Sequence, residues 1–308
     1  MANLRIIKSK IRSVGKTHQV TKAMEAVSGV KMRTSQMMAL SARPYARAAL
    51  RVLARISNSL DISSHPLVLK REVSKVLLVV ITSDKGLAGG LNSGVTKRAL
   101  SALRERGIPI ERTGIIALGR KGEEFFARRG YIIEDRITTA KNESTINDFQ
   151  SVVSLVTDLF EHGEYDECLL VYTNFHSTFE QEPVVRTLLP LSVESVREMI
   201  EGITPERGKF AETKEPRAES ERSLDYLFEP SASAIFETLI YRLVGIEIYH
   251  AFLESKASEH SARMVAMRNA SDKAREVSFL LTREYNKARQ SAITREMSEI
   301  IGGMESMK

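Results

Sequence analysis

The chain has 308 residues and 43% hydrophobic content, enough for one large domain or two modest ones with a buried core. Its longest apolar run, Val76–Ile81, is far shorter than the roughly 20 residues of a membrane-spanning helix, and its single cysteine, Cys168, excludes an internal disulfide and a cysteine-based zinc site. The net charge of +6 is unevenly placed, because residues 1–60 carry +11, with 12 Lys and Arg against the one acid Glu25, and the remaining 248 residues sum to −5.

Residues 1–60 predict one long N-terminal helix. Met1–Arg5 lacks the apolar stretch of a secretory signal, so we expect the chain to act in the compartment where it is made. Apolar residues recur at helical spacing, first at Leu4, Ile7, Ile11 and Val14, and after a one-residue phase slip at Val20, Met24, Val27, Val30 and Met37. Pro44 leaves two alternatives, a kink against the carbonyl of Leu40 or the end of the helix.

Residues 61–200 alternate strand and helix patterns, which predicts a central α/β domain of the Rossmann-like type. Ser63–Pro66 is expected to be a linker. We expect strands at Lys75–Ile81, Thr113–Leu118, Glu167–Tyr172 and Val184–Leu189, and helices at Val95–Arg106, Lys121–Arg129 and Ile146–His162. This alternation favours a largely parallel sheet, in which the last strand is a candidate for antiparallel pairing.

Residues 201–230 hold three prolines and mixed charges, typical of a solvated connector, and residues 231–308 predict a second long helix. Ser231 or Ser233 can cap this helix, and the pair Gly302-Gly303 can stop it. At about 1.5 Å per residue, the roughly 70 residues between would span on the order of 105 Å, so we expect the helix to project from the domain.

The two terminal helices are expected to pair as an antiparallel, left-handed, two-helix coiled coil. The heptad frame of the last helix is Ile246, Tyr249, Leu253, Ala257, His260, Met264, Met267, Ser271, Ala274, Ser278, Leu281, Tyr285, Ala288 and Ala292. Ala and Ser supply little hydrophobic energy, so a dimer built on this stripe would be weak. A partner helix in the same chain loses far less association entropy, which favours the N-terminal helix.

The charge of the first helix indicates an acidic partner, since +11 on one segment repels itself unless acidic groups or a polyanion face it. A basic coiled-coil protein that binds nucleic acid is the first alternative. The basic residues, however, are spread around the helix, and Tyr45 is the one aromatic side chain available for base stacking. A helical hairpin that acts only as a spacer is the plainer interpretation.

Three motifs then resemble the gamma subunit of F-type ATP synthases. The opening helix carries Ile11–Val14 (IRSV) and Thr21–Glu25 (TKAME), and the α/β domain begins with Ser83–Asn92 (SDKGLAGGLN). The last helix carries Ser261–Asn269 (SARMVAMRN) and Tyr285–Ile300 (YNKARQSAITREMSEI). The motifs stand in the family's order from end to end of the chain.

The resemblance implies the central rotor shaft of a rotary enzyme. Its paired helices would stand inside a ring of three alpha and three beta subunits, with acidic lever loops on beta supplying the counter-charge. The α/β domain would form a foot on the c ring and bind the epsilon subunit. It further implies a peripheral protein on the cytoplasmic face of a bacterial inner membrane, with no cofactor, no nucleic acid and no catalytic site of its own.

Matching the motifs residue by residue implies two sets of partner contacts. Contacts with the alpha/beta ring would be made by Lys22, Met24, Lys31, Arg33, Arg263, Arg289, Gln290, Thr294, Glu296 and Ser298. Contacts of the foot with the c ring or epsilon would be made by Tyr226, Phe228 and Glu229. Plainer interpretations exist, with Met24 as part of the helix stripe and Glu296 beside Arg295 as a solvated face.

Two patterns indicate other chemistry and are set aside. Gly86–Gly90 follows a strand, but it has neither phosphate-loop spacing, so a tight turn is favoured over a nucleotide-binding α/β enzyme. The six histidines lack the spacing of metal ligands, and no serine, cysteine or lysine lies in a nucleophile motif.

Overall fold

The structure is a computed structural model that describes residues 2–59, 65–137, 145–192 and 229–305. Two long helices, α1 (Ala2–Ser59) and α6 (Ala232–Glu305), enclose all the other elements in the sequence. The chain divides into two compact units: Met1–Gly29 with Arg263–Lys308, here the two-helix unit, and Val30–Ala262, here the sheet unit. Almost all of the predicted connector, residues 201–230, lies outside the described residues.

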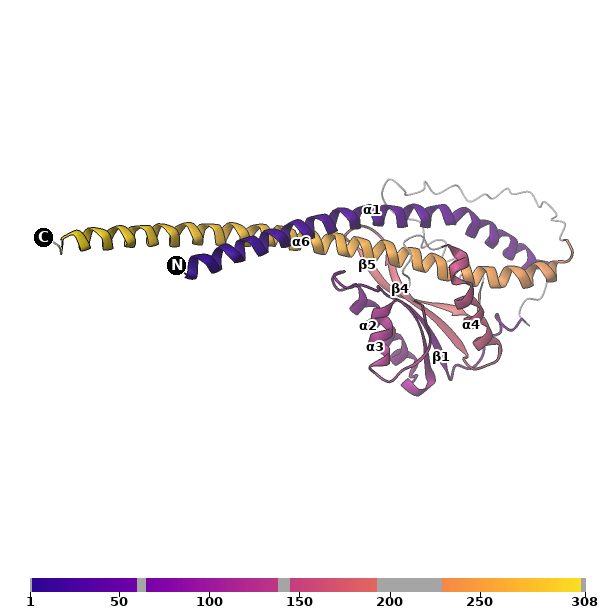
Figure 1. Ribbon diagram of the computed structural model, residues 1–308. Coiled ribbons are helices and arrows are strands. Elements are labelled where there is room, and N and C mark those ends of the chain that lie inside the picture. Colours follow the sequence, from indigo (N-terminus) through magenta and orange to yellow (C-terminus); the bar gives the residue numbers. More distant parts are fainter. Residues whose placement is uncertain (1, 60–64, 138–144, 193–228, 306–308) are drawn as a thin grey trace. The chain divides into compact units, whose positions relative to one another are not determined.

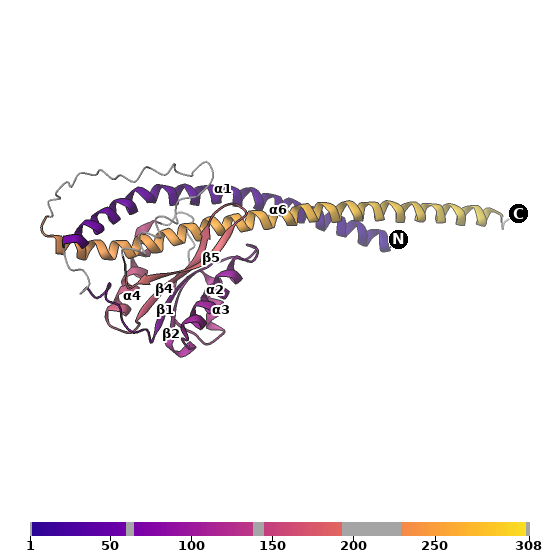
Figure 2. The same cartoon turned by 180° about the vertical axis from the view of Figure 1, so that it is seen from behind.

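The sheet unit is built on five strands in the order β3-β2-β1-β4-β5 (Figures 1 and 2). The strands are β1 (Val76–Ile81), β2 (Thr113–Leu118), β3 (Ile132–Ile137), β4 (Glu167–Phe175) and β5 (Gln181–Leu189). Strand β1 pairs in parallel with β2 and β4, β2 pairs in parallel with β3, and β5 pairs antiparallel with β4. The predicted mixed sheet with an antiparallel last strand is therefore confirmed.

Helices cover both faces of this sheet, as Figure 1 shows. Helices α2 (Leu91–Arg106) and α3 (Arg120–Ala127) lie on one face, and α4 (Gln150–Glu161) and α6 lie on the other. Alternate residues of β1 point to opposite faces, so Leu78 joins the core under α2 while Leu77 joins the core under α6. Both side chains are fully buried, which explains why the strand is a continuous apolar run.

Strand β3 was missed by the sequence patterns. Its segment Ile132–Ile137 carries Glu134, Asp135 and Arg136 in succession and is half exposed. Within the described sheet it is an edge strand paired with β2, and its Ile133 and Ile137 are partly buried against the two cores. Charged residues are common on such edges because they discourage pairing with other chains.

The remaining connections include two 3₁₀ helices, η2 (Ile110–Arg112) and η3 (Ile146–Phe149). The predicted helix from Ile146 thus begins as a 3₁₀ turn and becomes α4 at Gln150. Its start is fixed by a capping box, in which the backbone N–H of Thr145 donates to Asp148 Oδ2 at 2.7 Å.

The ends of the long helices follow the predictions only in part. Helix α1 does not end at Pro44 but continues to Ser59. Helix α6 begins after Ser231, whose hydroxyl accepts the backbone N–H of Ala234 at 3.2 Å, as expected of a cap. The predicted stop at Gly302-Gly303 is wrong, because the helix runs on to Glu305. A glycine costs a helix about 1 kcal/mol relative to alanine but does not by itself end it.

The two-helix unit is an antiparallel pair with the predicted frame on α6. His18 Nδ1 lies 3.0 Å from the carbonyl and hydroxyl oxygens of Ser271, and a Cβ on Gly29 would lie 3.2 Å from Met264 Sδ. Residue numbers therefore increase along α1 in the direction in which they decrease along α6, so the two helices are antiparallel. The frame positions are all buried or half buried, namely Met264, Met267, Ser271, Ala274, Ser278, Leu281, Tyr285, Ala288 and Ala292.

The predicted phase slip on α1 is wrong. Val20 and Val27 are 58% and 54% exposed, whereas Thr21 and Ser28 are 8% and 3% exposed. The frame therefore continues through His18 in unbroken steps of four and three. Farther along α1, in the sheet unit, Val30 and Met37 are likewise exposed, at 66% and 58%. The hydropathy pattern assigned the wrong residues of α1 to the seam. Small polar residues occupy the seam, and the valines are exposed on the outer face.

This corrected seam predicts that a substitution at Ser28 changes stability much more than the same substitution at its neighbour Val27. Ser28→Leu should destabilise the two-helix unit by about 1–3 kcal/mol, because a larger side chain overpacks a closely spaced seam. The control Val27→Leu places the same side chain on the exposed face and should change stability by less than about 0.5 kcal/mol. Hydrogen exchange of peptides covering residues 18–32 measures both, and a larger loss of protection in Val27→Leu would contradict the assigned seam.

Candidate partner-binding surfaces

The two-helix unit carries a basic outer surface on α1. Its exposed cations are Arg5, Lys8, Lys10, Arg12, Lys16 and Lys22. Among these, and within the described residues, only Lys22 lies within ion-pair distance of a carboxylate, with its Nζ 2.9 Å from Glu25 Oε2. The positive charge is therefore largely uncompensated within the unit, and an acidic surface would find it accessible.

A row of exposed apolar side chains lies near the C-terminal end of α6. Ile293, Met297, Ile300 and Met304 are 49%, 58%, 65% and 66% exposed, and their steps of four, three and four place them on one face. Sequence reasoning missed this row, although the same spacing rule outside the seam frame could have found it. A contiguous apolar face of this kind typically marks a binding surface.

The structure places the predicted ring-contact residues in different environments. In the two-helix unit the exposed ones are Lys22, Arg289, Gln290, Thr294, Glu296 and Ser298. Met24 is half buried beside the seam. Arg263 is only 8% exposed, so little of its side chain is accessible to a partner. In the sheet unit Lys31 is half buried and Arg33 is exposed.

At one of these exposed positions, Thr294, the side chain already forms a hydrogen bond within its own helix. Thr294 Oγ1 donates to the carbonyl of Gln290 at 3.0 Å, so its hydroxyl is engaged within the helix. Of the three predicted foot contacts, Tyr226 and Phe228 lie outside the described residues, and Glu229 is exposed just before α6.

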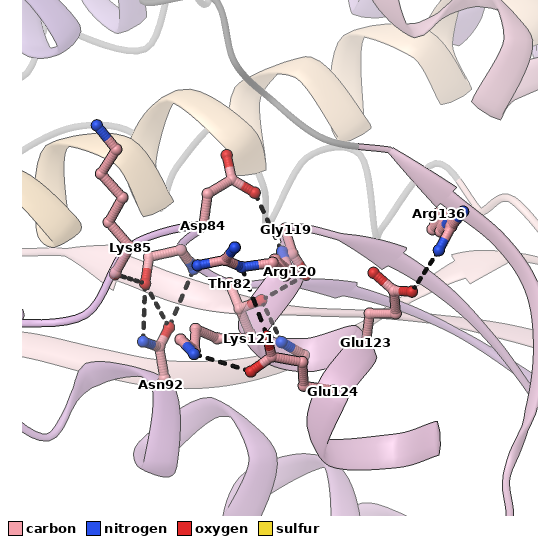
Figure 3. Close-up of polar contacts among 12 residues, drawn as sticks. Thr82, Asp84, Lys85, Asn92, Gly119, Arg120, Lys121, Glu123, Glu124 and Arg136 are labelled. Carbon is pink, nitrogen blue, oxygen red and sulfur yellow. Dashed lines mark hydrogen bonds and ion pairs between the residues drawn. The ribbon is translucent and has the colours of Figure 1, made fainter. Parts of the chain in front are cut away.

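The glycine-rich loop after β1 is held by hydrogen bonds within the domain (Figure 3). The Asn92 side chain accepts the backbone N–H of Ser83 at 3.0 Å and donates to the Ser83 hydroxyl at 2.7 Å. Asp84 Oδ1 accepts the backbone N–H of Arg120 at 3.0 Å, which joins the ends of β1 and β2. The carboxylate of Asp84 thus ties this loop to the N-terminus of α3, the helix that follows β2. This arrangement favours the structural turn.

Ionisable side chains are buried between α6 and the sheet. Glu247 of α6 is 4% exposed, its Oε1 has no hydrogen-bond partner among the described residues, and it lies near Arg186 of β5. Burial raises the pKa of Glu247 from its ordinary 4.5 to about 8, against the opposing effect of Arg186. Burial also raises the pKa of Tyr172 on β4, and the carboxylates of Glu254 and Glu247 add to this shift.

Other candidate chemistry is sparse in the part of the chain that the structure describes. There, no group of three His, Cys, Asp or Glu side chains lies close enough to hold a metal ion. Cys168 is buried in β4, and burial raises the pKa of its thiol. None of the described helices has the length and apolar content needed to cross a membrane.

Comparison with known proteins gives consistent matches over the full chain. A family model described as ATP synthase matches residues 3–307. The ATP synthase gamma chain of Pelotomaculum thermopropionicum is 40% identical over 308 residues, covering 100% of both chains. The ATP synthase gamma chain of Cupriavidus pinatubonensis is 38% identical and covers 98% of this chain and 99% of its own.

Solved structures share the fold at lower identity. A chain of the Euglena gracilis mitochondrial ATP synthase, in a structure of its OSCP, F1 and c-ring, matches with a TM-score of 0.62 and 21% identity, covering 99% of this chain and 95% of its own. A chain from the central stalk and c-ring of Tetrahymena thermophila mitochondrial ATP synthase matches with a TM-score of 0.57 and 22% identity, covering 82% of this chain and 99% of its own.

Proposed function

Because the chain belongs to the ATP synthase gamma-chain family, we propose that its paired helices turn inside a ring of three alpha and three beta subunits while its α/β domain stands on the c ring. In this role it is the central rotor stalk of an F-type ATP synthase. It couples ion-driven rotation of the c ring to conformational cycling of the alpha/beta catalytic sites. It also regulates ATPase activity and proton flow.

The observation that carries the proposal is the outer surface of the two-helix unit. Five of the nine seam positions of α6 in this unit are Ala or Ser, while Ile293, Met297, Ile300 and Met304 are exposed. Exposing these apolar side chains to water costs roughly 25 cal/mol per Å² of apolar area. A surrounding apolar surface that buries them would therefore stabilise this end of α6. A ring that encloses the end of the shaft supplies that surface.

The basic surface of α1 supports contact with acidic lever loops on the beta subunits. Lys22 and Arg33 are exposed and Lys31 is half buried, so their charges can meet an acidic loop. As the shaft turns, each beta subunit would meet a different side of it. Contacts that differ between two conformers of a partner shift the populations of those conformers, which is the physical basis of the coupling.

The α/β domain would bind the epsilon subunit and the c ring, with Tyr226, Phe228 and Glu229 as proposed contacts. The chain would then be peripheral to the cytoplasmic face of a bacterial inner membrane, attached through the c ring. It would contribute no catalytic site or cofactor of its own to the proton-translocating ATPase. The polar groups of the Ser83–Asn92 loop support this, since internal hydrogen bonds engage them. The nucleic-acid alternative finds no support among the relatives.

Reconstitution with alpha and beta subunits tests the proposed function. With the chain present, the ATPase should become cooperative, and a bead attached to the sheet unit should rotate in one direction. Salt-sensitive co-purification of the native chain with DNA or RNA, without alpha and beta, would contradict the proposal. Hydrolysis of ATP by the isolated chain would instead favour an enzyme.

Charge reversal on α1 should weaken the coupling of ATP turnover to proton pumping. Lys22→Glu, Lys31→Glu and Arg33→Glu together replace attraction to acidic loops by repulsion, so we expect a roughly fivefold or greater fall in pumping per ATP. A matched control reverses three exposed cations that lie outside α1, with Lys70→Glu, Lys97→Glu and Arg104→Glu. Pumping and ATPase rates in membrane vesicles measure both. Equal effects of the two triple variants would count against the charge argument.

A further inference from the structure

The tip of the β4–β5 hairpin carries an aromatic side chain with no internal role. Phe179 is 81% exposed, the highest value among the large hydrophobic residues in the described part of the chain. It lies in the turn between Phe175, where β4 ends, and Gln181, where β5 begins. An aromatic side chain held in water at a loop tip is unfavourable unless a partner covers it.

The turn that carries Phe179 is held rigidly by hydrogen bonds. The Ser177 hydroxyl accepts the backbone N–H groups of Phe179 and Glu180 at 3.3 and 3.1 Å. Gln181 Nε2 donates to the carbonyls of Ser177 and Thr178 at 3.0 and 2.8 Å. A side chain presented on an ordered turn loses little conformational entropy on binding, which favours a contact of high affinity.

The hairpin tip is also fastened to α6. Ser261 Oγ donates to the carbonyl of Thr178 at 2.7 Å, and Ser258 Oγ donates to the carbonyl of Thr173 at 3.3 Å. A force on the tip therefore acts directly on the long helix, because both hydroxyls belong to it.

The position of the tip along α6 selects the partner. Ser261 lies two residues before Arg263, at which the second segment of the two-helix unit begins. The proposed foot contact, Glu229, precedes the other end of this stretch, and the 30 residues from Ser231 to Ser261 correspond to about 45 Å of helix. The tip is thus attached about 45 Å along α6 from the end that follows Glu229, the described residue among the proposed c-ring and epsilon contacts.

We propose that Phe179 is a docking residue through which the α/β domain binds an apolar depression on the rim of the alpha/beta ring. This inference rests on the proposed function, since it assumes that the ring is a partner. The hairpin would then bind the ring in addition to the contacts that the two helices make. Its fastening to α6 transmits load between the ring and the rotor.

Thiol footprinting tests the proposal on the full chain. Phe179→Cys introduces an accessible cysteine, while the native Cys168 is fully buried and should not react. The control, Ile132→Cys, replaces a 49% exposed residue of β3, at the opposite edge of the sheet. Assembly with alpha and beta subunits should slow maleimide labelling at position 179 by about tenfold or more and leave position 132 within about twofold.

Three results would overturn the inference. Unchanged labelling at position 179 in an assembled complex rejects the contact, and protection by epsilon or the c ring without alpha and beta rejects the partner. Protection of position 132 to the same degree shows general shielding. Failure of the chain to assemble with alpha and beta at all would instead reject the proposed function.

The affinity of the chain for the alpha/beta ring provides a second readout. Phe179→Ala should weaken binding by about tenfold, and Phe179→Leu should retain most of it, because an apolar depression accepts either large side chain. Ser261→Ala leaves Phe179 in place but loosens the tip, so it should weaken binding by a smaller factor. Equal affinities for wild type and Phe179→Ala would contradict the docking role.

Discussion

Glu247→Gln is expected to stabilise the protein by about 2–4 kcal/mol at pH 8 while changing its stability by less than about 1 kcal/mol near pH 4.5. The burial that raises the pKa of Glu247 from 4.5 to about 8 is the reason. The groups with which it interacts are Arg186 on β5 and Tyr172 and Cys168 on β4. Only Arg186 among them favours the charged carboxylate.

The sign of the effect follows from proton binding. In the folded state Glu247 keeps its proton up to about pH 8, whereas in the unfolded chain it loses the proton near its ordinary pKa of 4.5. Between these values the folded state binds more protons, so its stability falls as the pH rises. Above about pH 8 both states are ionised and the contribution becomes constant. Glutamine does not ionise, so the variant should lack this fall.

Urea unfolding from pH 4.5 to 9, followed by the near-ultraviolet circular dichroism of the tyrosines, measures the difference. The control is Glu237→Gln, an acid on the same helix whose side chain is 57% exposed. It should change stability little at any pH, because an exposed ion pair contributes at most about 1 kcal/mol. If the wild type and Glu247→Gln showed parallel pH profiles, Glu247 would have to be ionised at neutral pH in the folded state.

Gly119→Ala is expected to destabilise the sheet unit by about 4 kcal/mol or more. Gly119 has a φ of 111°, which a residue with a side chain adopts only with strain, and a Cβ there would lie against the backbone carbonyl of Thr82, far inside van der Waals contact. The same position joins β2 to α3, where the Thr82 hydroxyl donates to the carbonyl of Gly119 at 3.2 Å (Figure 3). The backbone has no room to move aside.

Gly107→Ala provides the matched control. Gly107 also has a positive φ, 67°, but nothing lies within 4 Å of the position its Cβ would take. It should therefore cost only the backbone strain, about 1–2 kcal/mol. Thermal unfolding of the two variants separates strain from collision, and equal midpoints would contradict the close approach of Thr82 and Gly119.

Local patterns were sufficient wherever a segment is buried on a regular face. The apolar run of β1 is fully buried, and Ser231 caps α6 as expected. On α6 the alternating steps of three and four identified the buried and half-buried positions from Met264 to Ala292, because most residues on that face are small or apolar. The same regularity predicted the parallel sheet. Motif resemblance, rather than periodicity, indicated the ring and c-ring partners.

Other features depended on residues distant in the sequence. Hydropathy favoured Val20 and Val27 for the seam of α1, but Thr21 and Ser28 lie there, because close approach of two helices requires small side chains more than apolar ones. Strand β3 carries three successive charged residues in place of a continuous apolar run, and its place in the sheet depends on pairing with β2. The seam face of α1 and the strand β3 can each be identified only when the neighbouring helix or strand is known.

By itself, the sequence determined the two long helices, the positions of the buried strands, the uneven charge and the family of this protein, since these depend on short-range periodicity and on motifs. Only the tertiary structure decided which face of α1 is covered, that Glu247 is buried beside Arg186, and that Phe179 stands exposed on a hairpin fastened to Ser261. The physical reason is that burial and pairing are properties of two surfaces in contact, and the sequence of one segment describes only one of them.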